Sequence, residues 1–180
     1  MLTALPWFLG AFGILNIGYW VHLNLKAARS QSRGVRELER PGFSTSSAPV
    51  TGDVVGRLDI PRLSLSTVVF EGADQDVLER GAGHLPGSAL PGEHGNIVLA
   101  AHRDTFFRAL RNIREGDVVK IHTPPGDSVY VVKSARVVEP DEVDVLKPTP
   151  QPALTLITCY PFRYIGPAPE RFVVRAVLAP

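Results

Sequence analysis

Three residues at the edges of predicted strands have the side chains that an acyl-transfer reaction requires. Cys159 ends the apolar run LTLIT, His102 ends the run NIVLAA, and Arg171 opens the run RFVVRAVL. A thiol is nucleophilic as its thiolate, and a neighbouring imidazole can take its proton or stabilise its charge. A guanidinium can stabilise the negative charge that develops on the attacked carbonyl oxygen. The three residue types together provide a nucleophile, an acid/base and an oxyanion donor.

The residue types alone leave a structural interpretation open. A single cysteine after an apolar strand is more often a small buried hydrophobic residue than a nucleophile. His102 can equally be a turn or capping residue, and Arg171 a surface arginine. Cys159 is the only cysteine of the chain, which excludes an intramolecular disulfide and a cysteine-rich metal site. The spacing of the three residues in the sequence does not by itself show that they lie close together in the fold.

The elements that must hold these residues are predicted to be short strands. Several apolar runs alternate with polar residues, which is typical of strands with one buried face, and turns rich in Pro and Gly separate them. The runs cover residues 54–60, 65–70, 96–101, 117–122, 128–138, 154–158 and 171–178. Helical patterns are brief, at 74–81 and 104–113. Seven or eight short strands with one or two short helices favour a single, mainly β barrel or sandwich.

The opening of the chain has a different composition from the rest. Residues 1–25 contain no Asp, Glu, Lys or Arg, although the 180 residues include 19 Lys+Arg and 18 Asp+Glu. As a helix, residues 2–25 would span about 36 Å, against about 30 Å for the hydrocarbon core of a bilayer. Trp7, Tyr19 and Trp20 lie toward its two ends, as interfacial anchors do. We predict one transmembrane helix; a buried core helix or a cleaved signal peptide is the alternative.

The composition divides the chain into three parts: a transmembrane anchor (1–25), a basic juxtamembrane segment and linker (26–53), and a catalytic domain (54–180). We expect residues 26–40 to continue the helix, with a break at Gly34, before a linker rich in Pro, Ser and Thr. The net charge of +1 gives no electrostatic footprint for nucleic acid, so we expect no nucleic-acid partner. Five basic residues follow the apolar segment: Lys26, Arg29, Arg33, Arg36 and Arg40. The positive-inside rule alone would then place the C-terminal domain in the cytoplasm.

The segment LTLITCYPFRYIGPAPERFVVRA (154–176) resembles the end of a sortase, whose signature is Thr-Leu-x-Thr-Cys followed by an Arg on the next strand. AAHRDTFFRAL (100–110) resembles the segment that carries the sortase histidine, and GRLDIPRL (56–63) resembles the opening strand of that family. The Pro-Phe pair after Cys159 and the HRDTFF sequence are most similar to class D sortases. The resemblance implies a closed β-barrel of about eight strands with one or two short helices, preceded by the N-terminal transmembrane helix.

The resemblance also implies a role for individual residues. Cys159 would be the nucleophile, His102 the general acid/base and Arg171 the group that stabilises the oxyanion or the substrate, with Arg175 as a rival for that last role. Thr158 would contribute a hydroxyl near the bound substrate. Four further residues would offer apolar contact to the substrate: Tyr160, Phe162, Tyr164 and Ile165. We assign His84 a structural role.

The implied enzyme is a membrane-anchored cysteine transpeptidase. It would cleave an LPxTG-like sorting signal near the C-terminus of a secreted protein through a thioacyl-enzyme. It would then transfer the acyl group to an amine, either a cell-wall peptide or a pilin lysine, in surface anchoring or pilus assembly. Residues 2–25 would hold the enzyme in the membrane, with the catalytic domain on the extracytoplasmic side, against the orientation that the basic flank favours.

We expect neither a cofactor nor a metal. The acidic groups Asp74/Asp76 and Asp141/Glu142/Asp144 are interpreted as solvated turns rather than calcium ligands. Two other functions stay open at this point: a cysteine peptidase that releases the acyl group to water, and a non-catalytic, membrane-tethered β-domain that binds peptides.

Overall fold

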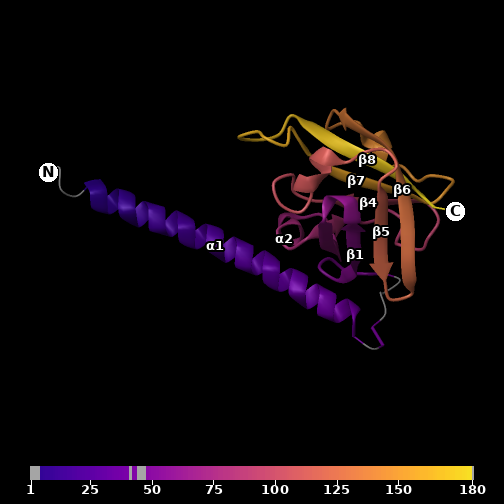
Figure 1. Ribbon diagram of the computed structural model, residues 1–180, viewed down its shortest axis with the longest axis horizontal. Helices are drawn as coiled ribbons and strands as arrows, with labels where there is room; N and C mark the ends of the chain where they lie inside the picture. Colours follow the sequence, from indigo (N-terminus) through magenta and orange to yellow (C-terminus); the bar gives the residue numbers. More distant parts are fainter. Residues whose placement is uncertain (1–4, 41, 44–47, 180) are drawn as a thin grey trace.

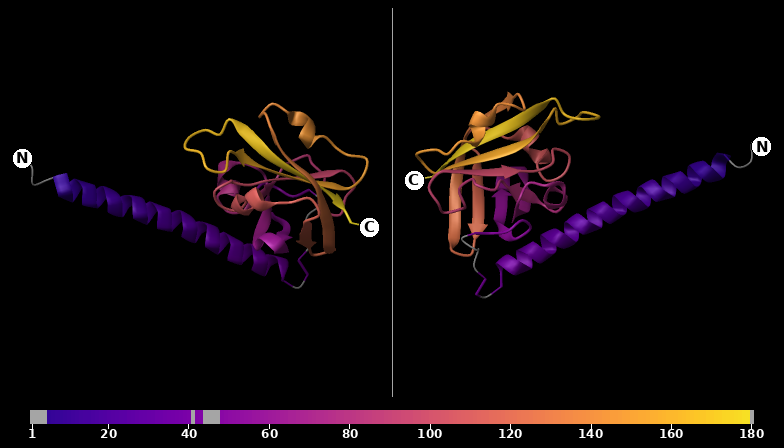
Figure 2. Two further views of the ribbon diagram at one scale, coloured as in Figure 1. Left: turned by 45° about the horizontal axis from the view of Figure 1, so that its top comes forward. Right: turned by 180° about the vertical axis from the view of Figure 1, so that it is seen from behind.

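The computed structural model describes residues 5–40, 42–43 and 48–179, and within them eight strands close into one barrel (Figures 1 and 2). The strands follow one another around the barrel in the order β1-β2-β3-β4-β7-β8-β6-β5. Their bounds are β1 (Val54–Ile60), β2 (Leu65–Glu71), β3 (Ala82–His84), β4 (Asn96–Ala100), β5 (Val118–Thr123), β6 (Gly126–Val138), β7 (Ala153–Tyr160) and β8 (Glu170–Leu178). The predicted mainly β barrel of about eight strands is confirmed.

The helices of the described residues are α1 (Leu5–Leu38), α2 (Gln75–Leu78) and three short 3₁₀ helices, η1 (Pro61–Leu63), η2 (Arg108–Asn112) and η3 (Val143–Leu146). The helical pattern expected at 74–81 yields only α2, where the Asp74 side chain accepts a hydrogen bond from the Val77 amide at 3.1 Å. The pattern expected at 104–113 yields the 3₁₀ helix η2 and turns. Short amphipathic segments gain little from helix propensity alone, so tertiary packing decides their form.

Alternate residues of the strands fill the inside of the barrel. Leu154 and Leu156 of β7 and Val174 of β8 are fully buried in the main core. The intervening residues of β7 and β8 face outward. Among them, Ile157 and Val173 pack under the β6–β7 connection that contains η3. Strands β7 and β8 are therefore covered on both faces over part of their length, which makes them a rigid support for the residues at their ends.

Strand β3 is the one strand of the described chain that we did not predict. Its three residues, Ala82, Gly83 and His84, show no alternation, and it exists because it pairs in parallel with β2 and antiparallel with β4. A Cβ at Gly83 would lie 2.2 Å from the Gly72 carbonyl oxygen. Glycine is required at this position for the close approach of the two backbones.

Helix α1 runs without interruption through Gly34, so the predicted break there is wrong. Gly34 is buried, and a Cβ at this position would lie 2.7 Å from Cγ1 of Val68 on β2. The Gln31 side chain accepts from the Val68 amide at 2.8 Å and donates to the Arg80 carbonyl at 2.7 Å. The Lys26 ammonium forms ion pairs with Asp76 and Glu79. The C-terminal third of α1 is thus packed against the barrel.

The N-terminal part of α1 stands clear of the barrel in all three ribbon views (Figures 1 and 2). Its apolar side chains are exposed, among them Phe12, Ile14 and Trp20. No helix in the described part of the chain is long and apolar enough to cross a membrane. The Trp7 side chain and linker residues 41 and 44–47 lie outside what the structure describes, and the divisions at 25/26 and 53/54 stay predictions.

Candidate active site

Cys159 and Arg171 face each other across the antiparallel pair β7–β8, where the register places them directly opposite. Opposite residues of such a pair have Cβ atoms about 4.5–5.5 Å apart. Because Leu154 and Leu156 point into the core, the two-residue period of β7 turns Cys159 outward. Both Cys159 and Arg171 are half-buried. The thiol and the guanidinium therefore share the outer face of the barrel.

His102 is brought to the same end of the barrel by the parallel pairing of β4 with β7. Ala100 lies opposite Ile157, and the pairing continues past the end of β4, since the Ala101 amide donates to the Ile157 carbonyl at 3.2 Å. Two residues further along each strand are His102 and Cys159. The Phe107 amide donates to the His102 carbonyl at 3.0 Å, which closes the turn after β4. The structure thus places all three predicted residues at the same end of three adjacent strands, β4, β7 and β8.

Thr158 points into the barrel and not toward the surface where we expected the substrate. It is 3% exposed, and its hydroxyl donates to the Ala101 carbonyl at 2.7 Å. The physical reason is the strand period, because the residue before an outward-facing cysteine must face inward. Its hydrogen bond instead ties β7 to the residue that precedes His102.

Arg175 lies on the same face of β8 as Arg171, but four residues away, which is about 13 Å along a strand. Its guanidinium donates to Oδ1 of Asn96 at 2.8 Å and to the Val145 carbonyl at 3.3 Å. Burial lowers the pKa of Arg175, and the nearby charge of Arg136 lowers it further. Arg175 therefore belongs to a hydrogen-bond network at the far end of β7, away from Cys159.

The Arg171 guanidinium has N–H groups that make no hydrogen bond within the described residues. Its Nη1 donates to the Ala168 carbonyl at 3.2 Å and to the Glu170 carbonyl at 2.9 Å. The guanidinium has five N–H donors, and within the described residues Nε and Nη2 make no hydrogen bond. These two nitrogens can bind a developing oxyanion.

An aromatic cluster lies at the Cys159 end of the β7–β8 pair, on the face opposite to the thiol, where Phe162 and Phe172 pack against the main core. The Tyr160 ring lies 6.0 Å from that of Phe162 and 6.3 Å from that of Phe172, and Phe162 and Phe172 are 5.2 Å apart, all between ring centroids. The structure thus groups two of the predicted substrate contacts. Phe172 was missed, because in RFVVRAVL it appears only as one more strand residue; its position next to Arg171 is the signal that could have identified it.

The other two predicted contacts lie on the connection between β7 and β8, which projects from the barrel (Figure 1). Tyr164 is 48% exposed and Ile165 is 101% exposed. They are not part of the aromatic cluster. Any contact that they make to a substrate must come from this projecting segment.

His84 is part of a separate, buried cluster. Its Nδ1 lies 2.6 Å from Oε2 of Glu71, and its Nε2 lies 2.9 Å from the Ser88 hydroxyl and 3.0 Å from the Ala89 carbonyl oxygen. The arrangement resembles a Ser-His-Glu triad, but a carbonyl oxygen only accepts, so Nε2 must carry a proton and donate it. The Ser88 hydroxyl donates to the Leu85 carbonyl at 2.8 Å. His84 cannot act as a base toward Ser88, which fits a structural role.

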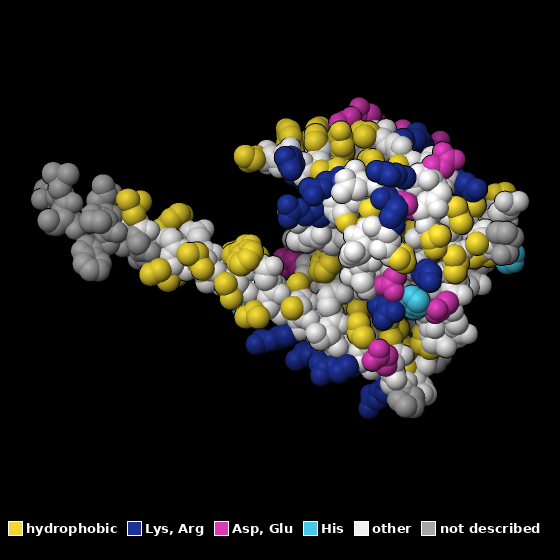
Figure 3. All heavy atoms as spheres, in the orientation of Figure 1, with side chains coloured by type: hydrophobic (Ala, Val, Ile, Leu, Met, Phe, Trp, Pro, Cys, Tyr) yellow, Lys and Arg dark blue, Asp and Glu magenta, His cyan; other side chains and the backbone are white. Residues whose placement is uncertain are grey.

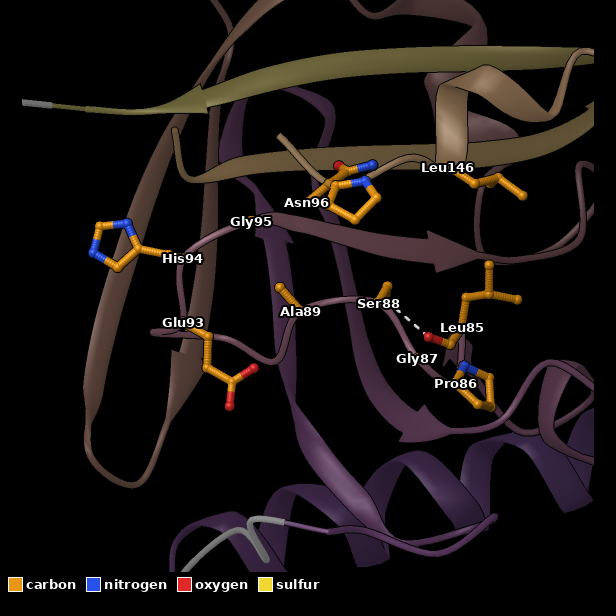
Figure 4. A pocket seen from close by; sticks show the side chains of 11 residues that line it. Leu85, Pro86, Gly87, Ser88, Ala89, Glu93, His94, Gly95, Asn96 and Leu146 are labelled. Atoms are coloured by element: carbon orange, nitrogen blue, oxygen red, sulfur yellow. Dashed lines mark hydrogen bonds between the residues drawn. The ribbon is translucent and has the colours of Figure 1, made fainter. Parts of the chain in front are cut away.

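A surface pocket of about 460 Å³ lies at the other end of β4 (Figure 4). Its walls come from the β3–β4 connection and from the end of η3, and they include Ser88, His94, Asn96 and Leu146. Asn96 is six residues before His102, or about 20 Å along an extended chain. The pocket is therefore separate from the Cys159 site.

Four of the five acidic side chains weighed as calcium ligands have other partners. Asp74 caps α2, Asp76 pairs with Lys26, and Asp144 pairs with Lys147 at 2.7 Å. Glu142 pairs with Arg136 at 2.6 Å. Within the described residues, no group of three or more His, Cys, Asp or Glu side chains could hold a metal ion.

A model of the sortase domain matches residues 58–179 of the chain. The protein belongs to the sortase family. It is 32% identical to Sortase D of Bacillus subtilis over 173 residues, which cover 92% of this chain and 87% of that protein. These matches confirm the resemblance to the family and to its class D.

Solved structures of sortases are similar to this chain in fold as well. The Sortase D5 transpeptidase of Clostridium perfringens has a TM-score of 0.74 at 28% identity, over 84% of this chain and 99% of that one. Sortase C of Clostridium perfringens SM101 has a TM-score of 0.67 at 28% identity, over 91% of this chain and 97% of that one.

Family membership confirms the predicted enzyme class. Sortases are cysteine transpeptidases that anchor surface proteins or assemble pili; they act on proteins with sorting signals and on amine acceptors, and are in general membrane-associated. The hydrolytic and the non-catalytic interpretations are not favoured.

Proposed function

We propose that this sortase cleaves an LPxTG-like sorting signal with Cys159 as the nucleophile. The observation that carries the proposal is the strand register, in which Cys159 lies opposite Arg171 and the chain after β4 runs beside β7 to His102. The Cys159 sulfur forms a bond to the carbonyl carbon of the signal's Thr, and the bond from that carbon to the nitrogen of the next residue breaks. The acyl part remains on the sulfur as a thioester.

His102 and Arg171 divide the remaining chemistry between them. His102 donates a proton to the leaving amine and later takes one from the incoming amine, a double use that suits an imidazole near neutral pH. The incoming nitrogen forms the new amide bond as the Cys159 thiolate leaves. Arg171 binds the oxyanion of both tetrahedral intermediates through Nε and Nη2, while its Nη1 is held by backbone carbonyls.

The substrates are secreted proteins with a C-terminal sorting signal, and the acceptor is the amine of a cell-wall peptide or of a pilin lysine. Tyr160 and Phe162 are proposed to contact the Leu-Pro part of the signal; with Phe172 they form an apolar cluster at the Cys159 end of β7, on the face opposite to the thiol. Tyr164 and Ile165 are available for further contacts because they are exposed.

We also propose that residues 2–25 attach the enzyme to the membrane as a single-pass anchor, with the barrel on the extracytoplasmic side. Exposed apolar side chains along the free part of α1, and the absence of charge in that segment, support this attachment (Figure 3). Arg29, Arg33 and Arg36 lie exposed just beyond it and argue for the opposite orientation. A reporter fused to the C-terminus that is active only in the cytoplasm would overturn the proposed orientation.

The enzyme test uses a fluorogenic LPxTG peptide and an added amine such as triglycine. We expect the wild type to yield the amide product in the presence of the amine, whereas a peptidase would yield only the free acid. Cys159→Ala should give neither product, with an unchanged melting temperature as the control for folding. Cleavage of the peptide by that variant would refute the nucleophile assignment.

A further inference from the structure

Arg103 joins the turn that carries His102 to the loop that follows Cys159. We call residues 161–169 the β7–β8 loop. Nη2 of Arg103 donates to the Tyr164 carbonyl at 3.0 Å and to the Gly166 carbonyl at 3.3 Å. Its guanidinium carbon lies 5.8 Å from the centroid of the Tyr164 ring, within the range of a cation–π contact. Nη1 is buried and has no hydrogen-bond partner among the described residues.

The β7–β8 loop has little else to hold its backbone. Arg163, Tyr164 and Ile165 are exposed to solvent. Outside the strand ladders, the hydrogen bonds that the described residues make to this loop come from two side chains, Arg103 and Arg171. Arg103 binds the middle of the loop, and Arg171 binds Ala168 near its end.

Both arginines are next to a residue of the reaction. Arg103 directly follows His102 in the chain, and Arg171 lies opposite Cys159 across the β7–β8 pair. The loop is therefore anchored to the catalytic end of the barrel and not to its remote parts. If the Arg103 contacts were lost, the loop backbone around Tyr164 would keep no side-chain hydrogen bond from the described residues.

We propose that Arg103 is a positioning residue, which fixes the β7–β8 loop beside His102 and so determines how tightly the enzyme binds the sorting-signal peptide. This inference rests on the proposed function. Arg103 bonds to loop carbonyls and not to the reacting groups, so its loss affects the KM for the peptide and leaves kcat nearly unchanged. A lysine would keep the charge, but its ammonium lies one bond nearer to the backbone than Nη2 and it has no planar guanidinium to place against the Tyr164 ring.

The test compares Arg103→Ala and Arg103→Lys with Arg163→Ala. The control removes one positive charge from an exposed side chain of the same loop that makes no hydrogen bond or ion pair within the described residues. With an LPxTG peptide and a saturating amine, we expect Arg103→Ala to raise the KM on the order of tenfold, the size expected when hydrogen bonds from a charged donor are lost. Arg103→Lys should recover only part of the affinity, and Arg163→Ala should stay within about twofold of the wild type.

The outcomes separate this inference from the enzyme assignment. A wild type that is inactive on sorting peptides would refute the proposed function. An active wild type with equal KM values for Arg103→Ala and Arg163→Ala would refute the positioning role alone. A fall in kcat with a shifted pH profile and an unchanged KM would also overturn it, because Arg103 would then act on His102. If Arg103→Ala does not fold, the KM of Arg103→Lys is compared with that of Arg163→Ala, and equal values would refute the positioning role.

Discussion

The hydrogen bond from Thr158 to the Ala101 carbonyl offers a sharp test of how the barrel holds its histidine. Thr158→Val keeps the shape of the side chain and removes the hydroxyl, which leaves the carbonyl oxygen before His102 without its 2.7 Å partner. Leaving a buried acceptor unsatisfied costs about 1–3 kcal/mol. For a chain of this size, each kcal/mol lowers the melting temperature by about 2–4 °C.

Activity should fall by more than the loss of stability explains. The Ala101 carbonyl belongs to the peptide unit that leads into His102, and a displacement of about 1 Å at a catalytic group can cost on the order of a hundredfold in rate. We expect kcat/KM of Thr158→Val for an LPxTG peptide to fall by about tenfold or more, measured at a temperature where the variant is fully folded.

The matched control lies on the same strand. Thr155 is buried as well, and its hydroxyl donates to Oδ1 of Asn96 at 2.6 Å, at the end of β4 away from His102. Thr155→Val should lose less free energy of unfolding than Thr158→Val, because Arg175 still donates to Oδ1 of Asn96, and should keep kcat/KM within about twofold of the wild type. Equal losses of activity in Thr158→Val and Thr155→Val would refute the reasoning, because the effect would then be one of stability alone.

Two further predictions follow from charged side chains. Arg171→Met should abolish transpeptidation with little loss of stability. Arg175→Met should instead lower the melting temperature, because its hydrogen bonds to Asn96 and Val145 are lost, and should retain most of the activity. The reverse pattern would assign the catalytic role to Arg175. The hydrogen bond from Arg62 lowers the pKa of Asp117 in the folded protein. The ionised Asp117 therefore stabilises the fold at any pH above the ordinary aspartate pKa, and this stabilisation is lost as the pH falls through the lowered pKa of the folded state. Unfolding measured from pH 6 downward to about pH 2 should therefore show a smaller acid-induced loss of stability for Asp117→Asn than for the wild type, and identical slopes would contradict this.

The local pattern of the chain was sufficient for most of the fold, and the resemblance of two segments to sortase motifs gave the candidate reacting residues. Short apolar runs, several of them alternating with polar residues, predicted every described strand except β3, because burial of one face leaves a period of two in the sequence. The Thr-Leu-Ile-Thr-Cys run and the HRDTFF run, through their resemblance to sortase motifs, made Cys159 and His102 the candidates for nucleophile and acid/base. Arg171 followed from its place at the start of the next strand.

Only the tertiary structure decided what these residues contact. Cys159 and His102 are 57 positions apart. They lie at the same end of the barrel because β4 pairs with β7, which the order of the strands in the chain does not reveal. The same packing turns Thr158 inward, engages Arg175 away from the site, brings Arg103 to the β7–β8 loop, and uses Gly34 as a contact surface for β2 where the sequence had indicated a helix break. Each of these depends on contacts between distant segments, whereas propensity and periodicity report only on neighbours in the chain.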